Sequence, residues 1–101
     1  MSDGAHANGS VLLTHAVGLH ARPSVKLTKL AKGFSSRIEL AAAEGGPWID
    51  AKSIVKVMAT KAPKGTTIHL RAEGQAAEEA VGALVALVER DFDEGDHAKS
   101  A

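Results

Sequence analysis

Two segments of the chain alternate apolar and polar residues, and this pattern limits the fold more than any other feature of the sequence. The segments are residues 37–41 and 66–71. A strand that alternates in this way buries one face and exposes the other. We expect Ile68 and Leu70 to point into the core, and His69 to lie outside it without a role. The chain therefore needs a small sheet that is covered on one side only.

Three segments with helical periodicity can supply that cover. The expected helices are residues 20–32, 53–59 and 76–91, and Gly33 is the expected C-cap of the first. The apolar stripe of the last helix consists of Ala77, Ala80, Val81, Leu84, Leu87 and Val88. Short strands at residues 11–14 and 48–50 complete the order βαββαβα. The sequence thus predicts an α+β fold with its helices on one face of the sheet.

The chain of 101 residues has room for one domain with a core of modest size. We expect residues 10–91 to form this domain, residues 1–9 to be disordered, and residues 92–101 to form an acidic, flexible tail with nothing to bury. The sequence has no cysteine, which excludes disulfides and thiolate chemistry. It also has no membrane-spanning apolar run and no signal-peptide pattern, so we expect a cytoplasmic protein without membrane insertion.

The residues of chemical interest lie together in the segment Gly18-Leu19-His20-Ala21-Arg22-Pro23-Ser24. Proline is tolerated in the first turn of a helix, so the helix is expected to begin at His20. The backbone N–H groups of a first turn have no intrahelical partner and suit an anion. An imidazole nucleophile with a guanidinium beside it indicates a phosphoryl group carried on His20. This chemistry requires no metal and no cofactor.

Further motifs follow in a fixed order: Ala31-Lys32-Gly33-Phe34, Ala51-Lys52-Ser53-Ile54, Lys64-Gly65-Thr66 and Ala72-Glu73-Gly74. Over about residues 10–90, the motifs resemble in order and spacing those of HPr, the family of histidine-containing phosphocarriers of the bacterial phosphotransferase system. The resemblance implies an open-faced β-sandwich with an antiparallel sheet of order 1-4-2-3 and three helices on one face. It also implies a carrier that is not itself an enzyme. Nδ1 of His20 would accept phosphate from enzyme I, which is charged from phosphoenolpyruvate, and pass it to an enzyme IIA-type acceptor in sugar uptake or nitrogen-related regulation.

The resemblance implies roles for residues outside the histidine as well. Arg22 would stabilise the phosphate, and Ser53 would be the regulatory serine that HPr kinase/phosphorylase modifies, although Ser53 suits a purely structural N-cap equally well. The implied docking residues for partners are Ile54, Val55, Met58, Lys29, Lys32 and Lys56, whereas Val57 is expected to contact the core. The pattern alone fits equally well a helix in which all four apolar residues, Ile54, Val55, Val57 and Met58, belong to the core. We expect a monomer.

The sequence departs from the family pattern at two places. Val17 stands where many relatives have a small polar residue that can cap the helix, which leaves the capping to His20 or to water. Residues 59–63 are more polar than the matching segment of relatives, which bears on the choice of partner.

The charge distribution leaves another class of function to consider. The net charge is zero, yet residues 20–64 contain nine Lys and Arg against three acidic residues. A basic segment suits an acidic partner or a nucleic acid, so a small α+β nucleic-acid-binding module is the alternative. Single-strand binders stack bases on aromatic side chains, and here these are only Phe34, Trp48 and Phe92. A third possibility is an autonomous histidine-dependent hydrolase, but the sequence shows neither an acidic partner for the histidine nor a metal cluster. We therefore expect a phosphocarrier that binds no nucleic acid.

Overall fold

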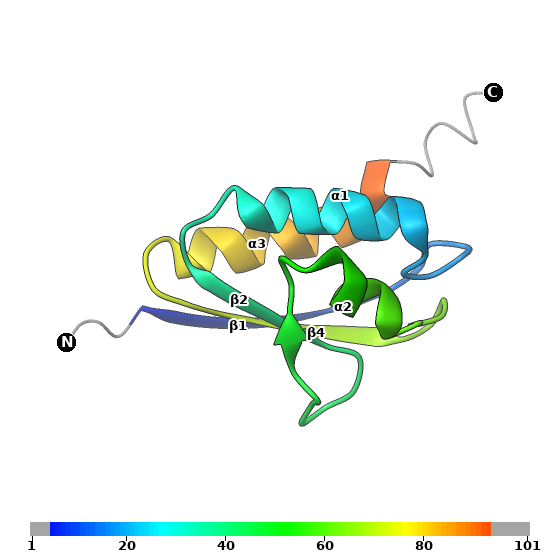
Figure 1. The fold of residues 1–101 in the computed structure, drawn as a ribbon, viewed down its shortest axis with the longest axis horizontal. Helices are drawn as coiled ribbons and strands as arrows, with labels where there is room; N and C mark the ends of the chain where they lie inside the picture. Colours follow the sequence, from blue (N-terminus) through cyan, green and yellow to red (C-terminus); the bar gives the residue numbers. More distant parts are fainter. Residues whose placement is uncertain (1–4, 94–101) are drawn as a thin grey trace.

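The computed structural model describes residues 5–93, which form one sheet and three helices (Figure 1). The elements are β1 (His6–Leu12), α1 (Ala21–Lys32), β2 (Arg37–Ala41), β3 (Ile49–Asp50), α2 (Ile54–Ala59), β4 (Thr67–Glu73), α3 (Ala77–Glu89) and the short turn η1 (Asp91–Asp93). The sheet is antiparallel with the order β1-β4-β2-β3. The helices cover one of its faces, and the other face is open (Figure 1). The predicted α+β open-faced sandwich is confirmed.

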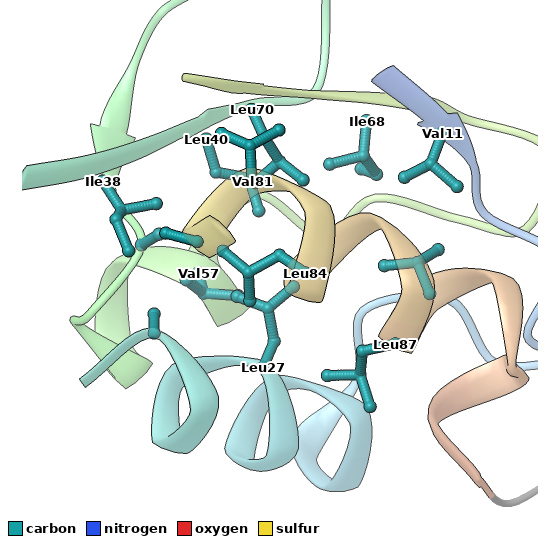
Figure 2. Packing of buried hydrophobic residues seen from close by; sticks show 14 of the residues in the cluster. Val11, Leu27, Ile38, Leu40, Val57, Ile68, Leu70, Val81, Leu84 and Leu87 are labelled. Atoms are coloured by element: carbon teal, nitrogen blue, oxygen red, sulfur yellow. The ribbon is translucent and has the colours of Figure 1, made fainter. Parts of the chain in front are cut away.

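The core lies between the sheet and the helices (Figure 2). Ile68 and Leu70 of β4 are fully buried, whereas His69 is only partly buried, in agreement with the alternation of the strand. Leu27 of α1 and Val57 of α2 are fully buried as well. All six residues of the predicted stripe of α3 are buried. Local periodicity therefore identified the inward faces of these elements.

The first strand begins earlier than the sequence predicted. β1 pairs with β4 from His6, opposite Glu73, to Leu12, opposite Thr67. The prediction that residues 6–9 are disordered is therefore wrong, while residues 1–4 lie outside the described residues. The first residues of β1 have small or polar side chains, so the strand gives little hydropathy signal. At Gly9 an added Cβ would lie 2.8 Å from Cγ1 of Val81, so the glycine lets α3 pack closely on β1.

The chain stays ordered after the last helix, contrary to the predicted start of a flexible tail. α3 ends at Glu89, and Phe92 in η1 is fully buried. A single apolar residue in a polar segment has no periodicity, which is why its burial was not predicted. The rest of the predicted tail, residues 94–101, lies outside the described residues. The fold thus extends past both limits of the predicted domain, 10–91.

The other elements agree with the prediction to within a few residues. His20 and Ser53 are the N-caps of α1 and α2, and Gly33 is the C-cap of α1. Across residues 5–93, no helix has the length and apolar character needed to span a membrane.

Candidate functional site

His20 occupies the N-cap of α1 with its side chain exposed. Its backbone is extended, with φ −85° and ψ −167°, and its carbonyl oxygen accepts the N–H of Ser24 at 3.0 Å. The side chain makes no capping hydrogen bond to the helix. The imidazole therefore stands at a helix start, accessible to a partner and uncommitted to the backbone of its own helix.

Arg22 lies in the first turn of the same helix, and its side chain is also exposed. A cation is poorly placed at a helix N-terminus, because the helix dipole is positive there. No acidic residue occupies this first turn to compensate. The position therefore suits a bound anion better than it suits helix stability.

The turn that leads to His20 is fixed against a distant segment. The N–H of Leu19 donates to the carbonyl oxygen of Ala62 at 2.9 Å. Gly18 has φ +67°, a conformation that glycine adopts readily and other residues rarely do. A Cβ at Gly18 would overlap the Ala62 oxygen and lie 2.9 Å from Cα of Pro63. Only glycine lets the two backbones approach this closely.

Buried hydroxyls tie the turn to the helix that follows. Oγ of Ser24 donates to the carbonyl oxygen of Leu19 at 3.2 Å, and Oγ1 of Thr28 donates to the carbonyl oxygen of Ser24 at 3.0 Å. Both side chains are buried, so these bonds are shielded from competing water. They hold Leu19, and with it the N-cap residue, at a fixed position relative to α1.

Val17 provides no cap for α1, because its side chain has no hydrogen-bonding group. The side chain is 58% exposed. Its backbone N–H donates to Nδ1 of His15 at 3.3 Å. The ring of His20 does not take over the cap.

The second helix divides its apolar residues between the core and the surface. Val57 is fully buried, whereas Val55 is 73% exposed and Met58 37% exposed. Ile54 is half-buried. Lys56 is exposed on α2, and Lys29 and Lys32 are exposed on α1. The two helices are in contact and lie side by side (Figure 1). Exposed apolar side chains beside exposed lysines are available for docking a partner.

Ser53 is a working N-cap. Its hydroxyl accepts the N–H of Lys56 at 3.3 Å, and its own N–H donates to the carbonyl oxygen of Asp50 at 3.1 Å. The structural role that the sequence allowed for Ser53 is therefore realised.

Sequence reasoning missed how residues 59–63 support the site. Oγ1 of Thr60 donates to the carbonyl oxygen of Val57 at 2.7 Å and accepts the N–H of Ala62 at 3.4 Å. These bonds fix Ala62, whose carbonyl oxygen receives the N–H of Leu19. Because the contact to the site is made by a backbone atom, no residue type could have indicated it.

The described part of the chain contains no group of three or more His, Asp or Glu side chains that could hold a metal ion. The arrangement instead offers an exposed nucleophile, a guanidinium and the N-terminus of a helix.

Comparison with known proteins gives a consistent result. Residues 7–90 match the sequence model of a family described as the PTS HPr component phosphorylation site. The phosphocarrier protein HPr of Cupriavidus necator is 42% identical over 84 residues, which is 83% of this chain and 92% of the relative. The phosphocarrier protein NPr of Escherichia coli K12 is 36% identical over 85 residues, 84% of this chain and 93% of the relative.

Solved structures agree with the sequence comparisons. The crystal structure of HPr from Thermoanaerobacter tengcongensis superposes with a TM-score of 0.79 at 34% identity, covering 86% of this chain and 96% of the other. Crh of Bacillus subtilis gives a TM-score of 0.65 at 33% identity, covering 75% of this chain and 85% of the other. Its crystal structure is described as an intertwined dimer with a swapped domain.

Proposed function

Because this chain belongs to the HPr family of phosphocarrier proteins of the phosphotransferase system, we propose that it carries a phosphoryl group on Nδ1 of His20. Proteins of this family are carriers, not enzymes, and they act with enzyme I and enzyme IIA-type partners. The observation that supports the proposal most is the exposed imidazole at the N-cap of α1, in the same helical turn as Arg22.

The transfer needs few groups from this chain. The neutral imidazole attacks the phosphorus of phospho-enzyme I through the lone pair of Nδ1. The bond from phosphorus to enzyme I breaks as the bond to Nδ1 forms. In the second transfer, phosphorus forms a bond to the acceptor, and its bond to Nδ1 breaks. The N–H groups of Ala21 and Arg22 and the Arg22 guanidinium stabilise the phosphate oxygens. Because such a transfer depends on positioning and charge, a small carrier suffices.

Arg22→Ala is expected to slow phosphoryl transfer by about ten- to a hundredfold. This factor corresponds to the loss of one hydrogen bond to a charged group, about 1.5–3 kcal/mol. Its thermal stability is expected to stay within about 0.5 kcal/mol of the wild type, because the side chain is exposed. Initial rates with phospho-enzyme I and a thermal melt measure the two effects. Arg37→Ala is the matched control, since it removes the same charge from the open sheet. A destabilised Arg22→Ala that transfers normally would make Arg22 structural.

We propose that enzyme I and the enzyme IIA-type acceptor dock on the outer surface of α1 and α2. The apolar contacts would come from Ile54, Val55 and Met58, and Lys29, Lys32 and Lys56 would attract an acidic partner. The exposure of Val55 supports this assignment, because such a side chain gains most from being covered. Ser53 lies at the start of this surface and is the proposed target of HPr kinase/phosphorylase.

Ser53→Asp is expected to keep the fold and to slow phosphorylation of His20 by about tenfold or more. Aspartate caps a helix as well as serine does, so α2 is retained. The added charge lies next to Ile54 and Val55, where it opposes an acidic partner and must be desolvated on docking. Initial rates with phospho-enzyme I and melting temperatures measure the two effects.

Two controls separate charge from capping and from net charge. Ser53→Ala loses the cap but adds no charge, and Ser10→Asp adds the same charge on the open sheet face. Both are expected to transfer at close to the wild-type rate. Equal rates for Ser53→Asp and Ser53→Ala would leave Ser53 a structural cap only.

A complete relay tests the proposed function. The chain is incubated with enzyme I, labelled phosphoenolpyruvate and either a sugar-type or a nitrogen-type enzyme IIA. Labelling of an acceptor is expected to require the presence of the chain. The acceptor that is labelled faster identifies the branch. Absence of label on both acceptors would contradict the carrier role. We further propose that the chain acts as a monomer in the cytoplasm.

A further inference from the structure

His15 fixes the turn before His20 by both its side chain and its main chain. Its Nδ1 accepts the N–H of Val17 at 3.3 Å, and its carbonyl oxygen accepts the N–H of Gly18 at 2.9 Å. A side-chain acceptor that binds the N–H two residues later is the geometry of an Asx turn, which asparagine and aspartate usually form. Here an imidazole nitrogen takes the place of the carboxamide oxygen.

The same ring also packs against the C-terminal turn η1. The rings of His15 and Phe92 meet edge to face, with centroids 5.7 Å apart and planes at 78°. Phe92 is fully buried, and its carbonyl oxygen accepts Nζ of Lys26 from α1 at 3.0 Å. This contact limits the orientations of the imidazole and keeps Nδ1 directed at Val17.

The turn η1 itself depends on that packing. Asp91, Phe92 and Asp93 all have φ between 57° and 61°, a left-handed conformation that non-glycine residues disfavour. Such a backbone persists only where the surroundings impose it. The burial of Phe92 and the hydrogen bond from Lys26 impose it here.

We propose that His15 is a positioning residue for phosphoryl transfer at His20. Its Nδ1 holds residues 17 and 18 in the turn, and the contact with Phe92 keeps the ring in the orientation that this requires. The need arises because Val17 offers no capping side chain and Gly18 has wide conformational freedom. Transfer demands close alignment of the attacking atom, so a turn that moves His20 slows it. The inference rests on the proposed function of His20.

Three substitutions separate the acceptor from the ring. His15→Asn keeps an acceptor for the Val17 N–H and loses the ring contact with Phe92. His15→Phe keeps a ring against Phe92 and loses the acceptor, and His15→Ala loses both. For each variant we would measure three properties: the exchange rate of the Val17 amide by NMR, the melting temperature, and the initial rate of phosphorylation by enzyme I.

The expected orders of stability and of transfer differ. His15→Phe should melt close to the wild type, exchange the Val17 amide about fivefold faster or more, and accept phosphate about tenfold more slowly. His15→Asn should melt lower, yet exchange and transfer within about twofold of the wild type. A residue with only a structural role would give transfer rates that follow stability.

Two results would overturn the proposal: His15→Asn as slow as His15→Ala, or His15→Phe as fast as the wild type. A wild-type chain that takes no phosphate would contradict the proposed function of His20 instead. In that case the Val17 exchange rates still decide whether His15 holds the turn, because they require no phosphoryl transfer.

Discussion

His20→Ala is expected to abolish acceptance of phosphate from enzyme I while leaving the fold intact. The imidazole is the proposed nucleophile, and its removal leaves no nucleophilic atom at the start of α1 that could accept the phosphoryl group. Because the side chain is exposed and makes no capping hydrogen bond, its loss should change the free energy of unfolding by only about 0.5 kcal/mol. Incorporation of label from phosphoenolpyruvate and a thermal melt measure the two effects.

The other histidines provide the controls. His6 and His69 belong to the sheet and lie away from the start of α1, and Nδ1 of His15 is engaged with Val17. His97 lies outside the described residues. His6→Ala and His69→Ala are expected to accept phosphate at the wild-type rate. Label that is retained in His20→Ala would place the carrier histidine elsewhere.

Gly18→Ala is expected to cause the largest loss of stability among the changes considered and to reduce transfer with it. A φ of +67° costs an alanine about 1–2 kcal/mol. The new Cβ would also overlap the backbone of Ala62 and Pro63, and overpacking of this kind costs about 1–3 kcal/mol. The loss of roughly 2–5 kcal/mol corresponds to a melting temperature lower by about 8 °C or more.

Two glycines elsewhere separate these contributions. Gly65 has φ +96° with no atom within 4 Å of an added Cβ, so Gly65→Ala should show the conformational cost alone. Gly82 lies in α3 in open space, and Gly82→Ala should stabilise the protein by about 0.5–1 kcal/mol. If Gly18→Ala is no more destabilised than Gly65→Ala, the close approach to Ala62 does not hold the turn.

Elements with strong local periodicity could be predicted from the sequence. In α3 the spacing of the apolar residues determines which side faces the sheet, and in β4 the alternation does the same for Ile68 and Leu70. The burial of Val57 was predicted as well, whereas the exposure of Val55 and Met58 was implied only by the resemblance to HPr, since the pattern of α2 did not separate them from the core. Periodicity did not supply the strand order β1-β4-β2-β3, which came from the resemblance to HPr.

Features that depend on small residues or backbone atoms could not be predicted. The predicted first strand began too late, because Ala7 and Gly9 on the inner face of β1 carry little hydropathy signal. The burial of Phe92 depends on the space that α1 and α3 leave, which no local pattern contains.

The candidate site shows the same division. The positions of His20, Arg22 and Ser53 at helix starts followed from proline placement and capping preferences. The contact between Leu19 and the Ala62 carbonyl joins segments far apart in the chain and is visible only in the structure.

The most direct test of the central claim is to identify the atom that bears the phosphate. The wild-type chain, labelled with ¹⁵N at its histidines, is phosphorylated by enzyme I and phosphoenolpyruvate and observed by ³¹P and ¹⁵N NMR. The account predicts a single phosphoramidate at Nδ1 of His20, labile in acid and stable in base. Phosphate on Nε2, on another histidine or on a hydroxyl group would contradict it.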